Sequence, residues 1–234
     1  MSDESDFIDN ELYLHYNQEF KATRIIDKII YPTHFKVEAD VWLEMDDLSQ
    51  EDRDYYINLA LVKINFWMTQ VLDNSVIFSK KNTFAWDFLM KNGRPSVENS
   101  TVVCPQEPAD DHIAMLLQSK LTSLSKEYAI FGGVTVTSDN SRGLSFTFVG
   151  SASEVLPDMK SWVGDRSYFD HPWWDRDDAS TFDTVPEKTE NLDEKPDYAY
   201  NLDFLGEAFK PNTEKVNTKV LKPSFKPTII KNDD

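Results

Sequence analysis

A strict alternation of apolar and other residues begins just after Thr33 and continues for ten positions. Apolar side chains stand at every second place from Phe35 to Leu43, and mainly charged residues occupy the places between them. A period of two residues is typical of a strand with one buried face. Residues 22–31 are rich in β-branched side chains and predict a preceding strand, with Pro32 marking the break between the two.

Two longer segments carry the helical period instead. Ser49 can cap a helix over residues 50–72, with acidic residues in the first turn, where the helix dipole favours negative charge. Apolar residues spaced three and four apart predict a second helix that begins near Pro108 and ends near Glu127. The apolar residues of the first helix cover more than one stripe, so we expect it to be covered on two sides.

Shorter apolar runs predict the remaining strands. Residues 76–78 and 84–88 resemble two short strands, and residues 101–104 predict a buried one. Two alternating segments, 134–137 and 144–149, flank a turn rich in Gly, Asn and Asp, which predicts a β-hairpin. This order of elements predicts an α+β two-layer sandwich with a mostly antiparallel sheet, two helices on one face and a ferredoxin-like order.

The sequence changes in character near residue 150, where the hydrophobic periodicity fades and prolines recur. We therefore expect four parts. They are an acidic N-terminal arm over residues 1–20, an α+β core domain over 21–150, an acidic extension with scattered aromatic residues over 151–207, and a tail rich in Lys and Pro over 208–234.

Charge and composition narrow the function classes. The chain of 234 residues has 41 acidic and 24 basic residues and a formal charge of −17. This balance argues against direct nucleic-acid binding, because that affinity comes from cationic side chains. A single cysteine excludes a disulfide scaffold and a multi-cysteine metal site. The acidic N-terminus has no signal-peptide pattern and no apolar run could span a bilayer, so we expect a cytoplasmic protein without membrane contact.

Motifs for cofactor chemistry are missing. The seven glycines form neither G-x-G-x-x-G nor G-x-x-x-x-G-K-[ST], and no G-x-S-x-G motif is present. We therefore expect no cofactor, and the sequence leans against an enzyme.

One cluster combines carboxylates and an imidazole at the start of the second helix: Glu107, Asp110, Asp111 and His112. Such oxygen ligands could hold Mg²⁺, or a general base could act beside the metal. Acids in a first helical turn are also favoured by the helix dipole alone, and this interpretation is preferred.

A second unusual segment, residues 170–178, surrounds two adjacent tryptophans with acids. His171 could join the acids as a metal ligand. The preferred interpretation is that Trp173 and Trp174 anchor a loop onto the domain or onto a partner, since paired tryptophans are costly to expose and are enriched at interfaces. The residues predicted to bind protein partners are Trp173, Trp174, Tyr198, Leu202, Leu205, Phe209 and Phe225.

These observations favour a non-enzymatic structural or assembly protein, of the kind found in viral or phage particles. It would bind other protein subunits, as a homo- or hetero-oligomer, through its core surface and an extended C-terminal arm. A metal-dependent hydrolase of phosphoesters is the alternative. A third hypothesis is an acidic nucleic-acid mimic that occupies a cationic groove on a DNA-binding protein.

Overall fold

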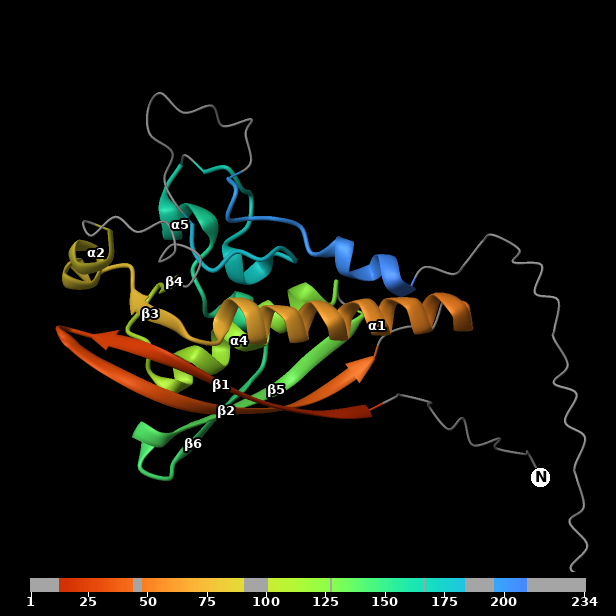
Figure 1. Cartoon of the computed structure of the whole chain (residues 1–234), viewed down its shortest axis with the longest axis horizontal. Coiled ribbons are helices and arrows are strands. Elements are labelled where there is room, and N and C mark those ends of the chain that lie inside the picture. Colours follow the sequence, from red (N-terminus) through yellow and green to blue (C-terminus); the bar gives the residue numbers. More distant parts are fainter. Residues whose placement is uncertain are drawn as a thin grey trace, which may run out of the picture.

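A six-stranded mixed sheet forms the centre of the computed structural model (Figure 1). The structure describes residues 13–43, 48–90, 101–126, 128–165, 167–183 and 196–209. The strands are β1 (Tyr13–Ile26), β2 (Ile29–Leu43), β3 (Ser75–Ser79), β4 (Thr101–Cys104), β5 (Ala129–Ser138) and β6 (Ser145–Val149). The α-helices are α1 (Gln50–Phe66), α2 (Thr83–Met90), α4 (Asp110–Leu124) and α5 (Met159–Val163), and α1 continues as the π-helical η1 (Trp67–Leu72). The short 3₁₀ helices are η2 (Asp139–Ser141), η3 (Ala152–Glu154), η4 (Trp173–Asp175) and η5 (Asp203–Phe209).

The long β1–β2 hairpin forms the two central strands of the sheet. Its two strands pair over their whole length, and the turn at Asp27 has a positive φ of 55°. The alternation predicted from Phe35 onwards is confirmed, since the apolar members up to Val41 are buried. The predicted break at Pro32 is wrong, because Pro32 lies inside β2 opposite Thr23. Proline is tolerated there because β5 pairs with β2 only from Phe35 onwards, so no partner strand needs its missing N–H.

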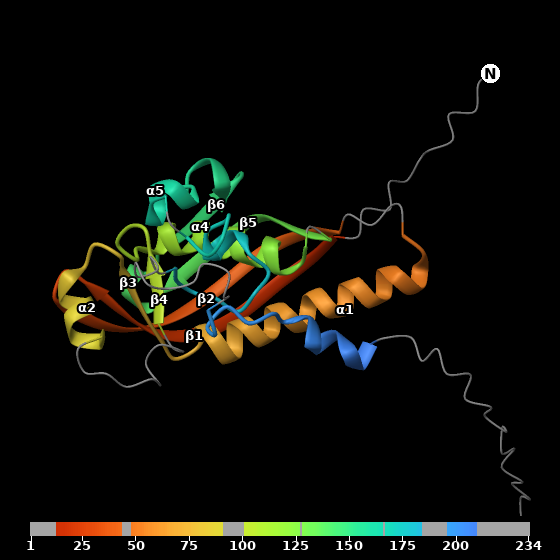
Figure 2. The same ribbon diagram turned by 90° about the horizontal axis from the view of Figure 1, so that it is seen from above.

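The sheet has the order β4-β3-β1-β2-β5-β6 and is mixed. Strands β5 and β6 add in an antiparallel manner beside β2, whereas β3 and β4 add in parallel beside β1. The general prediction of a mixed α and β fold is confirmed, but the ferredoxin-like order and the placement of two helices on one face are not. Parallel strands need long crossover connections, and these bring in helix α2, which the sequence did not indicate (Figure 2).

Most helix predictions are confirmed. Ser49 caps α1 by accepting a hydrogen bond from Asp52 N at 3.2 Å. The strand predicted over residues 84–88 is wrong, because α2 occupies that segment. Asn82 begins this helix, where its Oδ1 accepts from Ala85 N at 3.0 Å. The aromatic residues that suggested alternation then stack four residues apart, Phe84 on Phe88.

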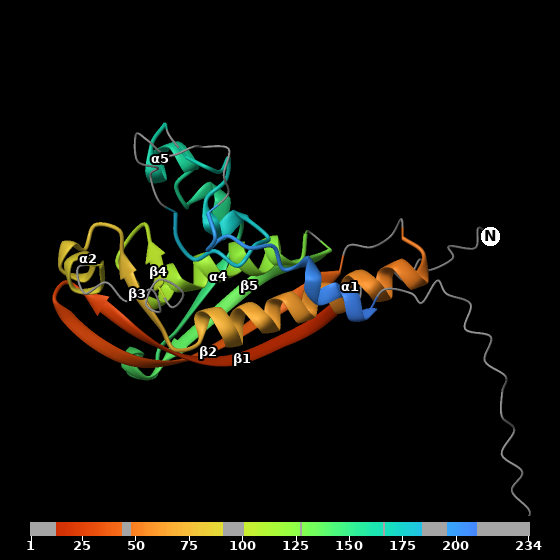
Figure 3. The same cartoon turned by 45° about the horizontal axis from the view of Figure 1, so that its top comes forward.

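The expected boundaries between arms and domain differ from the structure. Strand β1 begins at Tyr13, inside the segment assigned to the N-terminal arm. The segment over residues 151–183 contributes to the same hydrophobic core as the sheet, and in Figure 3 the part with α5 stands above α4 on the side away from the sheet. Only residues 208 and 209 of the predicted tail belong to the described part of the chain. Within that part, no helix has the length and apolar character that a bilayer span requires.

Lys120 of α4 holds residues 173–178 against the helix. Its side chain is fully buried, and Nζ donates to the carbonyl oxygens of Trp173, Arg176 and Asp178 at 2.8–2.9 Å. Burial lowers the pKa of Lys120 to about 7, and the nearby Asp178 carboxylate opposes this shift. Three backbone acceptors far from α4 in sequence therefore depend on one ammonium group.

Replacing this lysine should destabilise the protein strongly. Lys120→Met keeps a similar apolar stem but removes the donor from three carbonyl groups, two of them buried, which should lower the free energy of unfolding by about 3 kcal/mol. Urea unfolding followed by tryptophan fluorescence measures this loss. Lys160→Met is the matched control, because that side chain is 78% exposed and should change stability little. Equal stability of the two variants would contradict the role given to Lys120.

Candidate functional site

The predicted acidic cluster is not assembled as one site. Asp110 is buried and forms an ion pair with Arg24, Oδ1 to Nη1 at 2.6 Å, while its Oδ2 accepts from Ser138 Oγ at 2.7 Å. Arg24 also donates to Thr33 and to the carbonyl oxygen of Pro108. The Asp110 carboxylate is therefore engaged in joining α4 to strands β1, β2 and β5.

The other members of the cluster point to different surroundings. Glu107 and Asp111 are exposed, and His112 is buried with neither ring nitrogen hydrogen-bonded. His171 lies far along the chain on the exposed surface, where its carbonyl oxygen accepts from Arg176. Among the described residues, no three His, Cys, Asp or Glu side chains come together in a way that could hold a metal ion.

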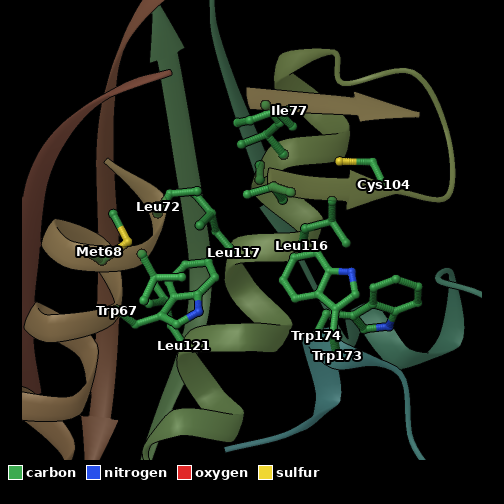
Figure 4. Close-up of a cluster of buried hydrophobic side chains, with 14 of the residues drawn as sticks. Trp67, Met68, Leu72, Ile77, Cys104, Leu116, Leu117, Leu121, Trp173 and Trp174 are labelled. Carbon is green, nitrogen blue, oxygen red and sulfur yellow. The ribbon is translucent and has the colours of Figure 1, made fainter. Parts of the chain in front are cut away.

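The two tryptophans lie inside the chain's own core, as the domain-anchoring interpretation expects. Both rings are at most 1% exposed and pack beside Leu116 of α4 (Figure 4). Trp173 Nε1 donates to the carbonyl oxygen of Val103 at 3.0 Å, and the Trp173 ring stacks on Trp67. These rings are therefore not a free surface for a partner.

The predicted C-terminal anchors also contact this chain. Leu202 is fully buried, Tyr198 packs on Phe182, and Leu205 is half-buried, whereas Phe209 is exposed. The last predicted anchor, Phe225, lies outside the described residues.

The helix η5, which carries Leu205 and Phe209, lies along α1 (Figures 1 and 2). Buried Lys63 of α1 forms an ion pair with Asp203, and Lys126 contacts the same carboxylate at 3.2 Å. These cations lower the pKa of Asp203 to about 2, against the opposing effect of its partial burial. These ion pairs thus hold η5 onto its own domain.

A separate apolar cavity lies between α1 and the sheet, and the sequence analysis did not identify it. Its volume is about 160 Å³, and nearly all of the surface that lines it is apolar. The first strands contribute Leu14, His15, Tyr16, Val41 and Leu43, helix α1 contributes Ile57, Ala60, Leu61 and Ile64, and β5 contributes Ala129 and Phe131. Exposed His15 and Leu61 mark where the cavity meets solvent.

Tyr16 is the unusual member of this lining. Its ring meets Phe131 edge-to-face at 5.7 Å, and its Oη is buried without a hydrogen-bond partner. Burial raises the pKa of Tyr16, so the hydroxyl keeps its proton and remains a donor. An unpaired buried hydroxyl is costly, and such groups in folded proteins call for an explanation. The one sequence signal for this site was the alternation of Leu14, Tyr16 and Phe20, which extends the strand pattern towards the N-terminus.

Comparisons with known proteins give distant matches. No family model and no curated protein matches the chain. Among solved structures, a catalytic-residue mutant of Plasmodium vivax 6-pyruvoyltetrahydropterin synthase is similar with a TM-score of 0.37 and 11% identity over 61% of this chain and 99% of that one. Another structure of the same Plasmodium vivax enzyme has a TM-score of 0.34 and 9% identity over 60% of this chain and 99% of that one. This likeness is too weak to assign a substrate or a reaction.

The expectation of a non-enzymatic assembly protein is corrected by these matches. The similar solved structures are of an enzyme, and they are neither virion nor structural proteins. The non-enzymatic assembly function is therefore not retained.

The unpaired hydroxyl of Tyr16 predicts that its removal will stabilise the protein. Tyr16→Phe removes a buried donor that has no acceptor, so it should raise the free energy of unfolding by about 1 kcal/mol. Tyr128→Phe is the control, because that hydroxyl contacts Tyr56 and its loss should not stabilise the protein. Urea unfolding of both variants tests the difference, and a loss of stability in Tyr16→Phe would show that its hydroxyl has a partner.

His112 predicts a loss of stability in acid. Burial lowers its pKa below the ordinary 6.5, with Asp111 opposing the shift, so the unfolded chain takes up the proton more readily than the folded chain. The free energy of unfolding should therefore fall as the pH drops below 6.5, and this part of the fall should be missing in His112→Leu. Exposed His171→Gln is the control, and unfolding curves at several pH values measure the slopes. Identical slopes in wild type and His112→Leu would rule out this contribution.

Proposed function

We propose that the protein binds a small, mostly apolar molecule with one ring and one hydrogen-bond acceptor in the cavity between α1 and the sheet. The observation that carries this proposal is Tyr16, whose side chain is part of the lining of an apolar cavity and whose buried hydroxyl is unpaired. Ligand sites in proteins commonly combine an apolar lining with a few polar groups that set orientation.

The size of the cavity supports a ligand of one ring. Its volume of about 160 Å³ is close to that of an engineered apolar cavity of roughly 150 Å³ in another protein, which stays dry and binds benzene. A fused bicyclic molecule would need side chains to move. The apolar lining also disfavours a charged ligand, because no buried cation or anion faces it to compensate the lost hydration.

The chemistry of Tyr16 supports an acceptor on that ring. The hydroxyl stays protonated because burial raises its pKa, so it offers a proton to a ligand oxygen or nitrogen. A ligand that accepts this bond gains an interaction and also removes the cost of the unpaired group. Of the lining residues, only His15 otherwise has a polar side chain, and it is 57% exposed at the mouth.

Benzene and pyridine are a matched pair of probes, since they have the same size and differ in one ring acceptor. In wild type we expect both to bind, and Tyr16→Phe should weaken pyridine about tenfold, equivalent to about 1.4 kcal/mol, while benzene keeps its affinity. Calorimetric titration, with ligand-induced shifts in Tm as a second readout, measures the four affinities.

A cavity-filling variant provides the control. Ala60→Leu places three more carbons into the space from α1, so it should abolish binding of both probes while the protein remains folded and gains stability. The proposal fails if neither probe binds wild type, if Ala60→Leu binds them as well as wild type, or if Tyr16→Phe weakens both probes equally.

A further inference from the structure

Strand β6 forms an open edge of the sheet. Apart from its pairs with β5, no backbone hydrogen bond made by β6 is found in the described part of the chain. Figure 1 shows β6 at the border of the sheet, beyond β5. Soluble proteins usually protect such edges with lysine, proline, a bulge or a covering segment. Residues 144–149 contain no charged residue and no proline, and no register shift is found in the β5–β6 pairing.

The side chains of this edge are also unusually apolar for an exposed strand. Leu144 is 61% exposed and Val149 is 75% exposed, and Phe146 also reaches solvent. On the helix side of the sheet Phe148 is only partly buried. Unpaired backbone groups and exposed apolar side chains therefore occur together along this edge strand, which is typical of a strand that another strand joins.

The opposite edge of the sheet is closed by this chain itself. Val103 N of β4 donates to the carbonyl oxygen of Thr181 at 3.0 Å, and Thr181 Oγ1 donates to the carbonyl oxygen of Thr101. A second copy cannot add there without displacing this segment. Head-to-tail growth, in which β6 of one chain joins β4 of the next, is therefore blocked, and two copies can extend the sheet only by joining β6 to β6.

We propose that β6 pairs in an antiparallel manner with β6 of a second copy of this chain, forming a closed dimer with twofold symmetry and a continuous sheet of twelve strands. Antiparallel self-pairing over all five residues centres the twofold axis on Thr147, the middle residue of the strand. Phe146 then lies opposite Phe148 of the partner subunit, and Ser145 lies opposite Val149 of the partner subunit. Aromatic and β-branched cross-strand pairs of this kind stabilise antiparallel strands.

The high negative charge of the chain favours the uncharged residues 144–149 as the contact between copies, and it predicts how salt affects the dimer. Two chains with a formal charge of −17 repel each other, so a contact between copies should avoid acidic side chains, as residues 144–149 do. Salt screens this repulsion, and it should therefore strengthen the dimer. A cationic partner would show the opposite dependence, because salt weakens attraction between unlike charges.

Sedimentation equilibrium of the full chain tests the proposal. At micromolar concentration we expect a species of twice the chain mass of 27.1 kDa, with tighter association as the salt concentration rises from roughly 0.05 to 0.5 M. A protein that stays monomeric throughout this range, or that forms larger open polymers, would overturn it.

Variants with a charge at Thr147, the residue on the twofold axis, distinguish a loss of strand pairing from a defect in folding. Thr147→Lys and Thr147→Glu each place two like charges opposite one another, so each variant alone should be monomeric. Mixing the two should restore a dimer, because the charges at the axis are then opposite, and a folding defect would not be rescued in this way. Val155→Lys, at an exposed apolar position outside β6, is the control and should dimerise like wild type. Dimerisation of Thr147→Lys alone, or no association in the mixture, would also contradict the proposal.

Discussion

The burial of one ammonium group determines how the second half of the chain packs. Lys120 has no contact with solvent, and its three hydrogen bonds all go to backbone carbonyl oxygens in residues 173–178. Those bonds hold Trp173 and Trp174 against α4, and the same region closes the outer edge of β4 through Thr181. The core and the closed edge of the sheet thus depend on a polar contact that is fully satisfied only when this segment is in place.

Helix α1 is covered on two sides, and the packing is close on one side and incomplete on the other. On the side of η5, Lys63, Lys126 and Asp203 form an ion-pair network, and Gly206 lies so close that a Cβ there would be 2.9 Å from Leu59 Cδ1 and from Tyr55 Oη. On the sheet side, packing is incomplete and leaves the cavity beside Tyr16. The expectation that this helix is covered twice agrees with the packing, but only the three-dimensional contacts show which side is full and which has space.

The excess of acidic residues has less influence on the fold than the formal charge of −17 suggests. Asp110, a member of the predicted metal cluster, is instead paired with Arg24, and elsewhere in the chain Asp183 is paired with Arg176. A buried ion pair orders its surroundings when further hydrogen bonds satisfy both partners, which Ser138 and Thr33 do for the first pair. The sequence could show that carboxylates were abundant, but not which cation would face each one.

Local patterns in the sequence determined local structure. The alternation from Phe35, the cap at Ser49 and the hairpin that ends at Val149 each depend on neighbours a few residues away, so their signals were complete in the sequence. Tertiary structure decided the parallel entry of β3 and β4, the helix over residues 83–90 and the burial of the tryptophan pair. It also created the cavity at Tyr16, because its lining comes from β1, β2, α1 and β5. These features depend on contacts between residues far apart in the chain. The local spacing of apolar residues does not indicate which distant surfaces will meet.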